Sequence, residues 1–94
     1  MPKPAVKQLP VAKERKQLFP RFKVLLHNDD VNDMGHVVRA LMRVFRFDRA
    51  ESERIMMEAH QKGVALCTVE PLEQAEFHRD QLIALSLIST IEPE

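Results

Sequence analysis

The stretch that decides the fold runs from residue 21 to residue 33 and reads RFKVLLHNDDVND. Phe22, Val24 and Leu26 lie on one side of an extended chain, which predicts a strand over its first seven residues. The six residues that follow are mostly Asn and Asp, which favour turns and helix N-caps, so they are predicted to form a loop. An acidic loop therefore joins the first strand to whatever follows it.

Two helices are predicted after this loop. The first has apolar side chains at spacings of three and four, namely Met34, Val37, Val38, Leu41, Met42 and Phe45. Its N-cap is Asn32 or Asp33. The second helix begins after Asp48, another candidate N-cap, and continues to about His60, and Gly63 supplies the left-handed residue that ends many helices.

Two strands and a third helix complete the predicted domain. Residues 64–69, VALCTV, form the second strand, and Pro71 fits the first turn of a helix that continues to about Ala84. Residues 85–91, LSLISTI, form the third strand. The order strand-helix-helix-strand-helix-strand predicts an α+β domain, with three helices packed on one face of a small three-stranded antiparallel sheet.

The composition narrows the function classes. Among 94 residues, 14 basic side chains balance 14 acidic ones, which argues against a dedicated nucleic-acid-binding protein. Two glycines are too few for a P-loop or a dinucleotide-binding fingerprint. A single cysteine, Cys67, excludes an internal disulfide and is expected in the core. No apolar run is long enough for a transmembrane helix, and no secretory signal is apparent.

The charge is unevenly distributed along the chain. Residues 1–20 carry five basic side chains against one acidic one, together with four of the six prolines. Because Pro is excluded from helix interiors and central strands, this segment is predicted to be a flexible basic extension, with residues 21–94 as the folded domain. The extension is either an inert leader or a handle for another protein.

The acidic loop is the densest polar feature of the sequence. Asn28, Asp29 and Asp30 are most simply turn and cap residues. A small cation site is the alternative, and an ammonium group suits it better than Ca²⁺ because the EF-hand spacing is missing. His60 shares a helix face with Met56, and it either stabilises the helix C-terminus or lines a pocket. No metal and no other cofactor is predicted.

Four stretches of the sequence resemble the ClpS family, the adaptors of the Clp protease. Residues 22–30, FKVLLHNDD, are similar to its opening strand and NDD loop. Residues 34–38, MGHVV, are similar to its M-E-F-V-V, and residues 55–63, IMMEAHQKG, to its I-M-L-x-V-H-x-x-G. The similarity continues through Cys67 and residues 73–76, EQAE, and covers nearly all of the predicted domain.

The resemblance implies a non-enzymatic, monomeric adaptor of the cytoplasm or the plastid stroma. Family members bind proteins whose first residue is Leu, Phe, Tyr or Trp, and hand them to a ClpA- or ClpC-type AAA+ ATPase for degradation by ClpP. The implied fold is the sandwich shared with the C-terminal domain of the ribosomal stalk protein. The N-terminal extension takes the role of the handle that delivery needs, and neither nucleic acid nor a membrane is an implied partner.

The resemblance also implies the site residues. A free α-amino group has a pKa of roughly 7.7–8.0 and is mostly cationic at neutral pH, so hydrogen-bond acceptors must bind it. The residues assigned to the amine and the adjoining backbone are Asn28, Asp29, Asp30, Asn32 and His60. The side-chain pocket is assigned to Met34, Val37, Met56, Ala59 and Leu87, with Met34 as a gate against Ile and Val. Docking on the ATPase is assigned to Glu73 and His78.

Several positions depart from the family pattern. The N1 proline and the capping-box Glu of the first helix are missing, and Gly35 replaces the latter, which predicts a loose helix start. Ala59 stands where Val is usual, which predicts a wider pocket, and His78 stands where Lys is frequent. The segment before the last strand is shorter than in the proteobacterial pattern, and Leu87 is aligned across that deletion.

Two other function classes stay open. A docking module similar to the ribosomal stalk protein would share the fold without needing the NDD loop or a histidine in a pocket, and binding of a Leu-initiated peptide separates the two. A small hydrolase that uses Asp29, Asp30 and His60 would have to show turnover, and the sequence offers it no recognisable nucleophile or metal set.

Overall fold

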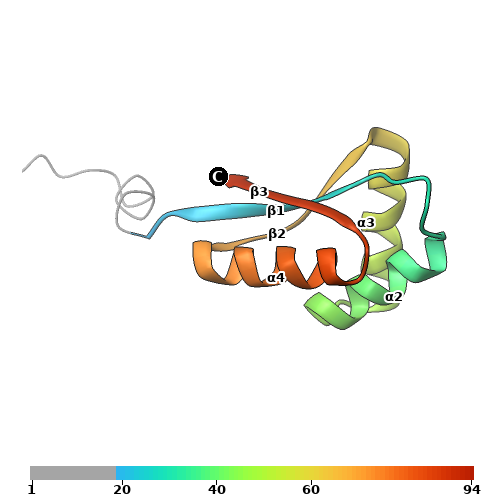
Figure 1. The fold of residues 1–94 in the computed structure, drawn as a ribbon, viewed down its shortest axis with the longest axis horizontal. Helices are drawn as coiled ribbons and strands as arrows, with labels where there is room; N and C mark the ends of the chain where they lie inside the picture. Colours follow the sequence, from blue (N-terminus) through green and yellow to red (C-terminus); the bar gives the residue numbers. More distant parts are fainter. Residues whose placement is uncertain (1–18) are drawn as a thin grey trace, which may run out of the picture.

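The computed structural model describes residues 19–94, so the predictions for residues 1–18 lie outside the described part of the chain. It contains six elements in the predicted order: β1 (Arg21–His27), α2 (Met34–Phe45), α3 (Arg49–Lys62), β2 (Val64–Pro71), α4 (Leu72–Ala84) and β3 (Ile88–Pro93). Figure 1 shows the three helices on one side of the sheet, with α4 running along the strands. The α+β fold predicted from the sequence is confirmed.

The first strand of the chain is the central strand of the sheet. The strand order is β2-β1-β3, and β1 pairs antiparallel with both neighbours. The register with β2 shifts between Val24 and Leu25, so that Cys67 is an extra residue of β2, as in a β-bulge. Val24 and Leu26 are fully buried and face the helices.

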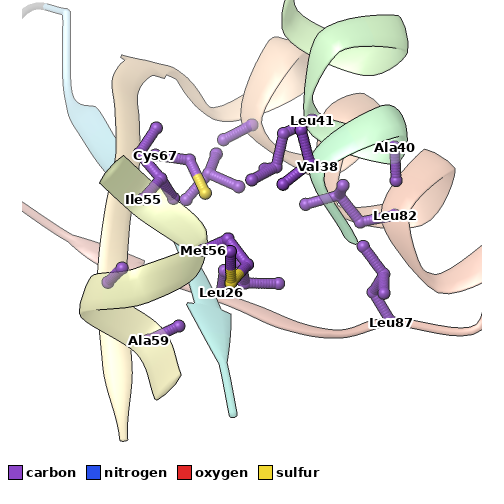
Figure 2. Close-up of a cluster of buried hydrophobic side chains, with 13 residues drawn as sticks. Leu26, Val38, Ala40, Leu41, Ile55, Met56, Ala59, Cys67, Leu82 and Leu87 are labelled. Atoms are coloured by element: carbon purple, nitrogen blue, oxygen red, sulfur yellow. The ribbon is translucent and has the colours of Figure 1, made fainter. Parts of the chain in front are cut away.

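The hydrophobic core lies between the sheet and the helices (Figure 2). The largest fully buried side chains come from every layer of the domain: Leu26, Leu41, Ile55, Leu82 and Val24. Cys67 is buried in this core, as predicted. Burial raises the pKa of the Cys67 thiol to about 12, so the thiol stays protonated and unreactive at neutral pH.

The helix ends follow the capping residues predicted from the sequence. The Asp33 carboxylate accepts a hydrogen bond from the His36 N–H at 2.7 Å and caps α2. Asp48 caps α3 in the same way, and Gly63 ends α3 with a φ of 89°. The Asp33 cap satisfies one backbone N–H of the first turn of α2, although the capping-box Glu is missing.

Three predicted boundaries were wrong. The third strand begins at Ile88 because Leu85 and Ser86 form a turn at the end of α4, in which the Ser86 N–H donates to Ile83 O at 2.9 Å. That strand also continues to Pro93. Pro71 is the last residue of β2 and the N-cap of α4, one position before the first turn in which it was predicted.

Arg46 ends α2 in the left-handed region, with a φ of 61°. A side chain there costs about 1–2 kcal/mol, and glycine avoids that cost but makes the unfolded chain more flexible. We expect Arg46→Gly to raise the free energy of unfolding by about 0.5–1 kcal/mol, measured by urea unfolding. Arg43→Gly, inside α2, should lower the free energy of unfolding, and equal losses in both variants would contradict strain at Arg46.

Candidate functional site

A cavity of about 230 Å³ opens where the β1–α2 loop meets α2 and α3. It is lined by all five residues assigned to the amine and its backbone, namely Asn28, Asp29, Asp30, Asn32 and His60. Four of the five residues assigned to the side-chain pocket also line it, namely Met34, Val37, Met56 and Ala59. Residues distant in the sequence therefore meet around one space.

The helices form the apolar side of the cavity. Met56 and Ala59 of α3 are 8% and 3% exposed, so they lie deep, whereas Met34 is 46% exposed and lies at the rim on the first turn of α2. Val37 follows Met34 by almost one turn and is half-buried. An apolar side chain that enters between the two helices would be removed from contact with water.

Asp29 is held in place by its own loop. Its Oδ1 accepts from the Val31 N–H at 2.9 Å and from the Asn32 N–H at 2.7 Å, and its Oδ2 accepts from Asn32 Nδ2 at 3.1 Å. The backbone hydrogen bond from Asn32 is the main reason why the pKa of Asp29 lies below its ordinary value. Asp29 is therefore an ionised carboxylate, with room for a further donor beside the three it already accepts.

Asn32 connects the loop to a distant turn. Its Nδ2 donates to Asp29 and also to the carbonyl oxygen of Ser86, at 2.7 Å. Ser86 lies in the turn after α4 and has a φ of 69°. Because both amide hydrogens of Asn32 are engaged, this side chain positions Asp29 and has only its Oδ1 to offer a ligand.

The other polar residues surround the mouth of the cavity. The Asn28 N–H donates to Gly63 O at 3.0 Å, which ties the start of the loop to the end of α3, and the Asn28 side chain is exposed. His60 is exposed on the last turn of α3. Asp30 is also exposed, and its carboxylate has no hydrogen bond within residues 19–94. Acceptors and negative charge therefore dominate this side.

Three residues that sequence reasoning missed also line the cavity, namely Leu26, His27 and Asp33. Leu26 could have been found, because the alternation of β1 turns it toward the helices just before the loop. His27 carries no such signal, and its Nε2 lies 2.7 Å from Thr90 Oγ1 of β3.

Leu87 does not line this cavity. It is 4% exposed and packs in the core, where Figure 2 shows it beside Leu82. The turn after α4 places Leu87 just before β3.

Glu73 and His78, assigned to docking, differ in their surroundings. Glu73 is exposed on the first turn of α4, a helix that begins at the end of the sheet opposite the β1–α2 loop (Figure 1). The His78 side chain is only 22% exposed: its Nδ1 contacts Glu70 Oε1, and its ring lies 4.9 Å from the Phe45 ring centroid. His78 therefore joins α4 to β2 and α2 and is not a free surface side chain.

Neither a metal site nor a membrane-spanning helix is found between residues 19 and 94. No group of three or more His, Cys, Asp or Glu side chains in this part of the chain could hold a metal ion. None of its helices is both long and apolar enough to cross a bilayer.

Comparisons with known proteins place these features in a family. Residues 17–88 match the family described as ATP-dependent Clp protease adaptor protein ClpS. The chain is 42% identical over 88 residues to the ClpS adapter of Synechococcus elongatus, covering 93% of each chain. It is 43% identical over 77 residues to that of Gloeobacter violaceus, covering 81% of this chain and 83% of the relative. The structure of Agrobacterium tumefaciens ClpS2 bound to L-phenylalaninamide is similar with a TM-score of 0.78 and 33% identity, covering 80% of this chain and 98% of that one.

Proposed function

Because the chain belongs to the ClpS family of ATP-dependent Clp protease adaptors, we propose that it binds proteins with a bulky apolar first residue in this cavity and delivers them to the Clp protease. The observation that carries the proposal is that one cavity joins an acidic loop to a buried apolar floor. Its ligand should therefore have a cation directly beside an apolar side chain, and the first residue of a protein has both. The protein would act by binding alone, without catalysis.

The acidic side of the cavity is proposed to bind the free α-amino group. This group is cationic at neutral pH and has three N–H donors. Asp29 would accept one of them as a carboxylate, while Asn28 and His60 would accept others, His60 through a water molecule. Asn32 would support the carboxylate, and Asp30 would contact the adjoining backbone. An acetylated terminus lacks the charge and would leave these acceptors unpaired.

The apolar side is proposed to hold the first side chain, which would be Leu, Phe, Tyr or Trp. Burying a Leu or Phe side chain contributes roughly 1.5–3 kcal/mol. Met56 and Ala59 would form the floor and Met34 the rim. The relative from Agrobacterium was solved with L-phenylalaninamide, a molecule with one amine and one aromatic side chain, and this supports the same ligand class here.

A peptide titration tests the proposal. Fluorescently labelled peptides that differ only in their first residue, covering all twenty residue types, are titrated with the protein, and the anisotropy is measured. Peptides that begin with Leu, Phe, Tyr or Trp should bind with micromolar or better affinity, and N-acetylated Leu should not bind. Equal affinity for all first residues, or none, would instead favour a docking module similar to the ribosomal stalk protein.

Delivery is proposed to use a second surface. The partner would be a ClpA- or ClpC-type AAA+ ATPase that feeds ClpP. Exposed Glu73 would contact it directly, and His78, held by Glu70 and Phe45, would position α4 for that contact. Because α4 begins at the end of the sheet opposite the β1–α2 loop (Figure 1), and the cavity lies at that loop, an adaptor could hold a substrate and the ATPase at the same time.

Deleting residues 1–17 should separate binding from delivery. All residues that line the cavity lie between Leu26 and His60, so peptide affinity should stay unchanged. Degradation of a Leu-initiated fluorescent protein by the ATPase and ClpP should stop, because the basic Pro-rich segment is proposed to be the handle. A full-length variant with its five N-terminal basic residues changed to Gln tests whether charge or length matters (Lys3, Lys7, Lys13, Arg15 and Lys16). Full degradation with the truncated protein would refute a role of this segment in delivery.

A further inference from the structure

Three arginines line one side of α2 outside the cavity. Arg39 and Arg43 are four residues apart and share one face of α2, and Arg46 follows them as the C-cap of this helix. The sequence of α2, MGHVVRALMRVF, contains no acidic residue. Within residues 19–94, none of the three arginines forms a salt bridge, whereas Arg49, Arg54 and Arg79 each pair with a carboxylate. This arginine stripe is therefore a local excess of positive charge on a domain whose total charge is negative.

Two hollows adjoin the arginine stripe. One of about 300 Å³ is lined by His36, Arg39, Ala40, Arg43 and Leu85, and the other, of about 190 Å³, by Arg43, Val44, Gln81, Ala84 and Leu85. His36 is fixed there because its Nε2 donates to Leu85 O at 2.7 Å. The hollows are thus lined by both apolar residues and arginines, which suits a peptide with acidic side chains.

The arginine stripe begins at the rim of the cavity. Asp33 and Met34 line the cavity, and Gly35 follows them. A Cβ at position 35 would lie 3.1 Å from Arg39 Nη1 and 3.2 Å from Asp33 Oδ1. The missing side chain at Gly35 therefore lets the Arg39 guanidinium lie over the first turn of α2, beside the mouth of the cavity.

Arg46 extends the stripe at a position that disfavours a side chain. Its φ of 61° lies in the left-handed region, where glycine is the usual residue. The backbone alone would favour glycine at this position. A long cationic side chain there is consistent with a binding role on the protein surface.

We propose that the arginine stripe binds the substrate chain downstream of its first residue and selects substrates with acidic residues there. The inference rests on the proposed function of the cavity. An extended chain advances about 3.3–3.6 Å per residue, whereas a helix rises about 1.5 Å per residue. A chain that leaves the cavity at Met34 would therefore pass Arg39 with its third residue and Arg46 with its sixth.

Charge favours an acidic substrate chain as the ligand of the arginine stripe over the protein's own N-terminal segment and over nucleic acid. Residues 1–20 of the protein itself are basic and would be repelled by the arginines. Residues 21–94 carry nine basic and thirteen acidic side chains, which disfavours an extended polyanion such as nucleic acid. An acidic second residue would lie near Asp33 and Asp30, so the preference should begin at the third position.

Peptides of matched sequence test the inference. Each begins with Leu-Ala and continues with four Glu, four Gln or four Lys at positions three to six. At low salt, the wild-type protein should bind the Glu peptide about five- to tenfold more tightly than the Gln peptide, and the Lys peptide more weakly still. The double variant Arg39→Gln/Arg43→Gln should lose this preference. Lys23→Gln, which removes a cation from the uncovered face of the sheet, should retain it.

Arg46→Gly gives an independent readout, because it should weaken binding of the Glu peptide while raising the stability of the protein. Equal affinities of the three peptides for the wild type, or a preference that survives in the double variant, would overturn the inference. An oligonucleotide that displaces the Glu peptide but not the Gln peptide would overturn it in favour of a general polyanion site. If the Gln peptide does not bind at all, the proposed function itself is refuted, and the inference with it.

Discussion

Asp29→Ala is expected to weaken binding of a Leu-initiated peptide by a factor of ten to a hundred or more. A hydrogen bond to a charged group contributes about 1.5–3 kcal/mol, and about 1.4 kcal/mol corresponds to a factor of ten. Asp29 is the ionised, well-positioned carboxylate of the cavity, so its loss removes the proposed main partner of the substrate amine. Isothermal titration with the free and the N-acetylated peptide measures the effect.

The hydrogen bonds within the loop require a second variant. Asp29→Ala also frees the Val31 and Asn32 N–H groups, so a loss of binding could come from a disordered loop. Asp29→Asn keeps Oδ1 as the acceptor for these N–H groups, but it removes the charge and puts an NH2 group where Oδ2 accepts from Asn32 Nδ2. It should lose binding to a similar extent, with a thermal stability closer to that of the wild type than the stability of Asp29→Ala. Asn32→Ala leaves the carboxylate and removes its support, so its loss should be smaller.

Acetylation of the peptide completes the test. In the wild type, the acetyl group should abolish binding, whereas in Asp29→Asn it should add little, because the partner of the amine is already missing. An acetylation penalty that is the same in both proteins would exclude Asp29 as the residue that binds the amine.

Ala59→Val should lower the affinity for Phe- and Trp-initiated peptides relative to Leu. Ala59 is 3% exposed and lies at the floor of the cavity, so two added carbons occupy space that a large side chain would fill. Two buried carbons correspond to roughly 1.6 kcal/mol of transfer free energy, which is a factor of about fifteen. Ala50→Val, on an exposed position of α3, is the matched control. Unchanged Phe-to-Leu and Trp-to-Leu ratios in Ala59→Val would exclude position 59 from the pocket.

Met34→Ala should admit peptides that begin with Ile or Val. Met34 lies at the rim, where its side chain would meet a branched Cβ. The control is Met57→Ala, which shortens an exposed methionine of α3 outside the cavity. If Met34→Ala still rejects peptides that begin with Ile or Val, another residue excludes them. Binding of the free amine should be the same in all these variants, since none of them touches Asp29.

The predictions from the sequence succeeded where the signal is local. Asp33, Asp48 and Gly63 set the ends of α2 and α3 through hydrogen bonds or backbone conformations within a few residues of themselves. The alternation of apolar residues in β1 and the helical spacing in α2 placed the core faces for the same reason.

The predictions failed where the cause is distant or leaves no mark in the sequence. Leu85 and Leu87 alternate like strand residues, but Ser86 turns the chain at a φ of 69° without a glycine to reveal it. The bulge at Cys67 depends on pairing with β1 and has no signal of its own. The link from Asn32 to Ser86 joins two segments whose polar groups show no reciprocal pattern in the sequence.

The place of β1 in the sheet has a consequence for the synthesis of the protein. The strand made first is the one that both later strands must flank, and its partner β3 is the last of the six elements to be made, with Phe22 opposite Pro93. Until β3 has left the ribosome, β1 can pair at most with β2, and its other edge stays open. We therefore expect the domain to become stable only after β3 has been made and has paired with β1. Until then the chain would also lack the contact between His27, which lines the cavity, and Thr90 of β3.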